Sequence, residues 1–176
     1  AMDDGTGDFY PDPIITIDAD SLDSYHAAAE RIEASGAEAI WLQHEYGIFG
    51  GEAGSHILEL VGATDLPLVL TLHTVLEEPS EEQEVVLRRL VDRAERTIVM
   101  ASRGAEILKR RYGVPDERLR TIPHGVPDRP LRDPDELKQR FGWSGRKVLM
   151  TFGLLAPDKG IRYMIEAMIA GIASIM

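Results

Sequence analysis

The sequence predicts an α/β fold, in which strands and helices alternate to form a Rossmann-like, doubly wound parallel sheet. Short apolar runs rich in β-branched residues alternate with longer segments that carry apolar residues at helical spacing. The short runs are apolar on both sides, as is typical of parallel strands that are covered by helices on both faces of a sheet.

Composition limits the possible function classes. The chain has 176 residues, 44% of them hydrophobic, which is enough for an ordinary α/β core. It carries 19 Lys and Arg residues against 30 Asp and Glu residues, a net charge of −11, which disfavours nucleic-acid and anionic-lipid partners. Cysteine is absent, so disulfides and thiolate metal sites are excluded. With no apolar run near about 20 residues and no signal-peptide pattern, a cytoplasmic protein without a membrane span is expected.

The first half of the chain follows a regular order. Residues 1–13 are acidic and polar, and we expect a disordered lead-in. The elements expected next are a short buried strand at 14–17, a helix at 21–35 ended by Gly36, a strand at 39–43, a glycine-rich loop at 44–54 and a helix at 55–61.

The order repeats in the following residues. Ser80 with Gln83 three positions later is a capping-box pattern that predicts a helix start. The expected elements are a strand at 68–72, the helix from Ser80, a strand at 97–100, a helix capped by Ser102 that stops at Gly113, and a strand at 120–123.

The chain changes character at 127–134, where three prolines predict a linker. A helix that begins at Asp133–Pro134, a buried strand at 147–152 and a helix from Ile161 should follow. We interpret 14–126 as a partial N-terminal domain and 135–176 as the start of a truncated second domain. Sheets without their neighbouring strands expose edges, so a homo-oligomer is expected, with the C-terminal strand and helix exchanged between chains.

Three histidines follow predicted strand ends: His44, His73 and His124. Ligands of parallel sheets bind beyond the carboxyl ends of the strands, so these residues are candidates for a ligand site. Each could equally be an ordinary exposed loop histidine. A metal site is disfavoured because no short-spaced ligand pair accompanies them.

The glycine-rich loop at 44–54 precedes a predicted helix. Glycines allow a ligand to approach the backbone, and Glu52 would repel a phosphate, so a sugar fits this loop better than a nucleotide. The alternative is that the glycines only satisfy turn geometry. A second candidate lies at 153–160, where Lys159 and Gly160 precede a helix that could hold a phosphate.

Four segments together resemble glycosyltransferase family 4, in the order expected for that family. They are Gln43–Gly51 (QHEYGIFGG), Thr71–Thr74 (TLHT), Ile122–Val126 (IPHGV) and Phe152–Gly160 (FGLLAPDKG). The resemblance covers about 14–167.

The resemblance implies a GT-B enzyme that uses a nucleotide sugar, retains the anomeric configuration and needs no cofactor or metal. Its N-terminal domain would bind the acceptor and its C-terminal domain the donor. His73 looks like the active-site histidine that contacts the donor sugar, and Lys159, with Gly153 and Gly160, looks like the site for the donor diphosphate. The residues that would line the sugar or acceptor side are His44, Glu45, Gly50 and Gly51, with His124 and Gly125 near the cleft.

The sequence departs from the family pattern. Leu154 stands where the family has an arginine, and the family's first strands and C-terminal paired glutamates are missing, so we expect the chain as given to be inactive. The end at 169–176 resembles nothing that we can assign. Two alternatives stay open: a sugar-nucleotide epimerase of the same architecture, and a non-catalytic module that binds a glycan or a protein, which Leu154 favours.

Overall fold

A computed structural model describes the backbone of residues 2–3, 15–153 and 159–173, and the side chains of 15–153 and 159–171. The chain divides into two compact units, Ala1–Val126 and Pro127–Met176.

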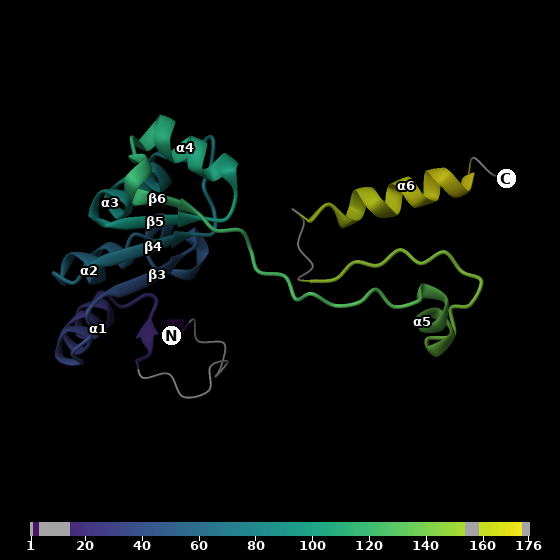
Figure 1. Ribbon diagram of the computed structural model, residues 1–176, viewed down its shortest axis with the longest axis horizontal. Helices are drawn as coiled ribbons and strands as arrows, with labels where there is room; N and C mark the ends of the chain where they lie inside the picture. The colour runs from purple at the N-terminus through teal and green to yellow at the C-terminus, as the bar shows by residue number, and fades with distance from the viewer. Residues whose placement is uncertain (1, 4–14, 154–158, 174–176) are drawn as a thin grey trace. The chain divides into compact units, whose positions relative to one another are not determined.

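The first unit contains a parallel four-stranded sheet in the order β3-β4-β5-β6 (Figure 1). The α/β fold with a parallel sheet and flanking helices is therefore confirmed. The strands are β3 Ile40–His44, β4 Leu68–Leu72, β5 Arg96–Val99 and β6 Leu119–Thr121; the helices are α1 Leu22–Ala34, α2 Ile57–Gly62, α3 Glu81–Arg93 and α4 Ser102–Tyr112. Short 3-10 turns are η1 Tyr46–Ile48, η2 Glu52–Gly54 and η3 Asp116–Arg118.

Several helix ends follow local sequence signals. Ser80 and Gln83 form the predicted capping box of α3, and Gly113 ends α4 in the left-handed conformation at φ 69°. Gly36, just after α1, has φ 76°. The prediction for Ser102 was wrong: Ala101 occupies the N-cap of α4, and no side chain caps this helix. Ser102 lies one residue inside the helix, where its backbone is already helical.

The core lies between the sheet and its helices. Leu68, Leu70 and Leu72 of β4 are fully buried against apolar residues of α3. On β3 the pattern is one-sided, since Leu42 is buried while Trp41 is 67% exposed. The described helices therefore cover one face of this edge strand and leave the other face open.

The N-terminal residues differ from the sequence prediction. The strand expected at 14–17 is shorter and later, because β2 is Ile17–Asp18 and Ile17 is only half-buried. The strand β1, Met2–Asp3, lies in the segment expected to be disordered and pairs in parallel with β2. Ile14 of the expected strand, and residues 1 and 4–13 of the expected lead-in, lie outside the described residues.

The second unit contains α5 Pro134–Arg140 and α6 Ile161–Ala173. Asp133 caps α5 as predicted, since its side chain accepts a hydrogen bond from the backbone N–H of Asp135. The buried strand predicted at 147–152 is wrong. These residues form no strand, and Leu149 and Phe152 are 61% and 95% exposed. A strand needs a hydrogen-bonded neighbour, and no other strand is described within this unit.

Candidate functional site

A shallow groove of about 440 Å³ lies at the carboxyl ends of β4 and β5. Its polar lining comes from His73 and Thr74 after β4, Arg103 at the start of α4, and His124 after β6. The rings of His73 and His124 lie 6.2 Å apart, centroid to centroid. Two of the three predicted histidines thus meet at the edge of the sheet where ligands of parallel sheets bind.

The His73 side chain is exposed and is held from the neighbouring strand. Its Nε2 lies 2.9 Å from Oε1 of Gln43 on β3, and its backbone N–H donates to the carbonyl of His44 at 3.0 Å. The ring is therefore oriented by two contacts from β3. From the sequence, Gln43 was noted only as part of a motif. A polar residue at the end of an apolar strand was nevertheless a signal that its side chain lies near a ligand site.

Glu45 connects the loops that follow β3 and β4. Its Oε1 accepts from the backbone N–H of Tyr46 at 3.1 Å, and its Oε2 accepts from the hydroxyl of Thr74 at 2.7 Å. Both carboxylate oxygens are thus occupied by protein groups. Thr74, which adjoins His73, was missed as a contributor in the sequence analysis.

His44 is not in the groove. Its side chain is fully buried between Tyr46, at 5.1 Å, and Phe49, at 5.8 Å between ring centroids. Neither ring nitrogen has a hydrogen-bond partner among the described residues, and burial lowers the pKa of His44 to about 4. A neutral ring in this position fills the core.

The predicted glycine pair at 50–51 serves the packing of the loop. The N–H of Gly50 donates to the Tyr25 hydroxyl at 3.0 Å, and its carbonyl accepts from the N–H of His56 at 3.0 Å. A Cβ atom on Gly50 would lie 1.6 Å from the carbonyl oxygen of Ala19, which no side chain tolerates. Gly51 has φ 76°, a left-handed conformation that favours glycine.

The predicted phosphate residues belong to the second unit. Gly160 has φ 66° and immediately precedes α6, so Lys159 and Gly160 do stand at a helix start. Lys159 and Gly153 are exposed, and Gly153 has φ 128°. Leu154, the departure from the family pattern, lies outside the described residues. Gly125, in the first unit, is exposed with open space around it.

Arg103 gives the groove a cationic group that the sequence analysis did not identify. Its guanidinium donates to Glu77 at 2.7 Å and to Glu106 at 3.4 Å. Arg110 forms a further ion pair with Glu77. The positive charge of Arg103 is thus balanced by nearby carboxylates and remains exposed to solvent.

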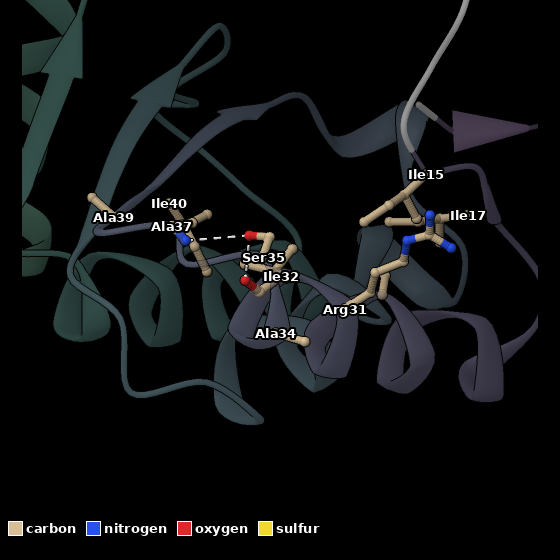
Figure 2. A pocket seen from close by; sticks show the side chains of 10 residues that line it. Ile15, Ile17, Arg31, Ile32, Ala34, Ser35, Ala37, Ala39 and Ile40 are labelled. Atoms are coloured by element: carbon tan, nitrogen blue, oxygen red, sulfur yellow. Dashed lines mark hydrogen bonds between the residues drawn. The ribbon is translucent and has the colours of Figure 1, made fainter.

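A larger apolar groove of about 720 Å³ lies elsewhere on the first unit (Figure 2). It is lined mainly by isoleucines and alanines from β2 and the residue two before it, from α1, and from the segment between α1 and the start of β3, with Arg31 beside Ile17. Among the described residues that line it there is no acid and no histidine. We therefore take the groove beside His73 as the candidate site, although it is the smaller of the two.

Neither a metal-binding cluster nor a membrane-spanning helix occurs among the described residues. No set of three or more His, Cys, Asp or Glu side chains there is arranged to hold a metal ion. No helix there has the length and hydrophobicity needed to cross a membrane.

Comparison with known proteins gave two matches. The model of a family described as Glycosyltransferase Family 4 matches residues 19–129, which include all of the sheet and the groove. An alpha-D-kanosaminyltransferase from Streptomyces kanamyceticus is 26% identical, over an alignment that covers 58% of this chain and 31% of that protein. The chain thus spans less than a third of this curated relative's length. No solved structure matches.

Proposed function

Because the chain belongs to glycosyltransferase family 4, we propose that the protein transfers a sugar from a nucleotide-sugar donor to an acceptor hydroxyl with retention of configuration. The kanosaminyltransferase relative supports a sugar as the transferred group. The sugar would be a hexose or an amino-hexose, and no cofactor or metal would be required.

The proposed reaction breaks the bond between the anomeric carbon and the diphosphate oxygen of the donor. The acceptor oxygen forms the new bond to that carbon on the face from which the diphosphate leaves, which retains the configuration. The nucleoside diphosphate leaves with the electron pair, and its phosphate oxygen takes the proton of the acceptor hydroxyl. A cation near the leaving diphosphate and hydrogen-bonding groups around the sugar would stabilise the charge that develops. Lys159, with Gly153 and Gly160, is proposed for the diphosphate, and His73 for the sugar.

The single observation that carries this proposal is the groove beside His73. Residues from two of the motifs, His73 and His124, lie in one groove with their ring centroids 6.2 Å apart, at the carboxyl ends of the strands. Glu45 and Thr74 support the rim of this groove and would fix the loops between which a sugar binds. A sugar presents several hydroxyl groups around its ring, and these can form hydrogen bonds with the polar side chains of the groove.

The test measures release of nucleoside diphosphate from a panel of nucleotide sugars by the protein at its natural full length. We expect release with at least one donor and its loss in the His73→Ala variant, while circular dichroism stays unchanged. His26→Ala is the control, since His26 is an exposed histidine on α1 outside the groove. The 176-residue chain should show no turnover, because the described residues of its second unit contain no sheet that could support a nucleotide site.

Other outcomes would point elsewhere. A changed sugar without release of nucleoside diphosphate would indicate an epimerase. No reaction with any donor, together with binding of glycans or proteins, would indicate a non-catalytic module. Equal release of nucleoside diphosphate by the His73→Ala variant and the unaltered protein would show that His73 has no role in the site.

We also propose that the chain self-associates through exposed parts of its sheet. The edge strand β3 leaves Trp41 67% exposed, and the apolar groove in Figure 2 lies beside the start of the same strand. Such surfaces favour association with a second copy. Light scattering of the chain at high concentration should give at least twice the monomer mass of 19.5 kDa, and a monomer mass would overturn this proposal.

A further inference from the structure

We infer that Gln43 is a positioning residue that holds His73 in one tautomer, with the proton on Nε2 and Nδ1 available to accept a hydrogen bond from a ligand hydroxyl. This inference deepens the proposed function and rests on it for the identity of the ligand. Its first step, the choice of tautomer, depends on the contact between the two side chains alone.

The orientation of the Gln43 amide favours a proton on Nε2 of His73. Oε1 of Gln43 lies 2.9 Å from Nε2 of His73, and an amide oxygen can only accept a hydrogen bond. A neutral imidazole carries one N–H, so a proton on Nε2 leaves Nδ1 as an acceptor. Among the described residues nothing bonds to Nδ1 of His73.

The parallel pairing of β3 with β4 produces this contact, and a second contact between the two strands has the same spacing. In the parallel register Gln43 lies opposite Thr71, and its side chain reaches His73 two residues further along. Trp41 lies opposite Val69, and its Nε1 donates to Thr71 Oγ1, again two residues further along, at 2.8 Å. Successive side chains on the same face of a strand are two residues apart, so both contacts follow from the same diagonal spacing.

The backbone limits movement of the ring. The N–H of His73 donates to the carbonyl of His44, which extends the pairing of β3 with β4 to the residue that carries the imidazole. The ring therefore starts from a fixed backbone position, and Gln43 needs to fix only the side-chain torsions. An acceptor nitrogen held in a groove matches the hydroxyl of a sugar, which can donate a hydrogen bond to it.

The test reads the tautomer directly by nuclear magnetic resonance. The 176-residue chain is labelled with ¹⁵N-histidine and studied at about pH 8.5, some two units above the ordinary histidine pKa. Long-range correlations between ring protons and nitrogens distinguish the two neutral forms, and the signals of His73 are identified by their loss in His73→Ala. We expect the Nε2–H form in the unaltered chain.

Three variants separate the inference from a merely structural role. Gln43→Leu removes the acceptor and should give a mixture of tautomers, whereas Gln43→Glu keeps an acceptor oxygen and should preserve the Nε2–H form. Trp41→Phe removes the neighbouring contact to Thr71 and should leave the His73 tautomer unchanged. A proton on Nδ1 in the unaltered chain, or the same tautomer with Gln43→Leu, would overturn the inference.

Activity of the full-length protein provides the second readout. Gln43→Leu should lower kcat/KM by about 10- to 100-fold, the range found for partners that orient metal-bound histidines, and Gln43→Glu should recover most of it. Unchanged kcat/KM in Gln43→Leu would overturn the positioning role. Absence of any transferase activity would count against the proposed function, while the tautomer measurement would still decide the inference about Gln43.

Discussion

The hydroxyl of Thr74 donates to Oε2 of Glu45 at 2.7 Å, so the loop after β4 is tied to the loop after β3 directly beside His73. The same carboxylate also accepts from the backbone of Tyr46 at the start of η1. A single side chain thus fixes the positions of both loops that border the groove.

Removing this contact should destabilise the first unit. Thr74→Val keeps the shape of the side chain but leaves Oε2 of Glu45 without its donor. A half-buried hydrogen bond to a charged group contributes about 1–2 kcal/mol, so we expect a loss of that size in the free energy of unfolding, measured with urea. Thr74→Ser keeps the hydroxyl and should lose less than half as much. No loss in Thr74→Val, together with a loss in Thr74→Ser, would mean that the methyl group, and not the hydrogen bond, stabilises the loops.

Buried His44 should make stability depend on pH. Burial lowers its folded-state pKa to about 4, below the ordinary value of about 6.5 that applies to the unfolded chain. Between these values the unfolded state binds the additional proton. The stabilisation is therefore complete above about pH 6.5 and falls as the pH drops toward 4, by about 3 kcal/mol in total.

The measurement compares urea unfolding at several pH values for the unaltered chain and His44→Leu. Leucine suits the apolar surroundings of Tyr46 and Phe49 and cannot titrate. Between pH 4 and 6.5 the unfolding free energy of the variant should change less steeply with pH, by the amount that the binding of about one proton causes. The same slope in both proteins would show that other groups cause the acid sensitivity.

The two serines near helix starts form a matched pair. Ser80→Ala removes the capping-box contact to the N–H of Gln83 and should cost about 1 kcal/mol of unfolding free energy. Ser102→Ala changes a residue that caps nothing and should stay within about 0.5 kcal/mol. A larger loss at Ser102 than at Ser80 would contradict this assignment of the caps. Urea unfolding of both variants decides it.

A pair of glycines tests the tight packing of the loop after β3. Gly50→Ala would place a methyl group 1.6 Å from the Ala19 carbonyl, so we expect a loss of more than about 4 kcal/mol or failure to fold. Gly47→Ala, in the same loop, meets open space and should change stability by less than about 1 kcal/mol. Thermal unfolding compares the two, and a well-folded Gly50→Ala protein would contradict the described path of the loop.

Local signals in the sequence predicted much of the fold. The strand at 68–72 was placed without error, because a short run of apolar and β-branched residues favours a buried strand over a helix. The capping box at Ser80 and the left-handed glycines at 36 and 113 fixed helix ends through contacts within a few residues. The predicted strand at 147–152 failed, because strand formation depends on a partner that the local sequence does not specify.

The candidate site was predicted less completely. The sequence placed His73 and His124 at the strand ends, and the structure brings them into one groove. It also placed His44 in a loop, but β3 continues through His44, and alternation along the strand then turns its side chain to the same buried face as Leu42. The predicted end of the strand was wrong by one residue, and for that reason His44 was expected at the ligand site although its side chain lies in the core. The roles of Gln43 and Thr74 depend on contacts between strands, which a single sequence does not reveal.

The close approach of Gly50 to the Ala19 carbonyl has a consequence for how related sequences are compared. Natural selection would retain this glycine in any descendant that keeps the loop, including one that has lost all activity. Its presence in another protein therefore indicates inheritance of the fold and gives no information about turnover. Gln43 and His73 are exposed and replaceable without harm to the core, so their joint retention or joint loss is the better marker for sorting active relatives from inactive ones.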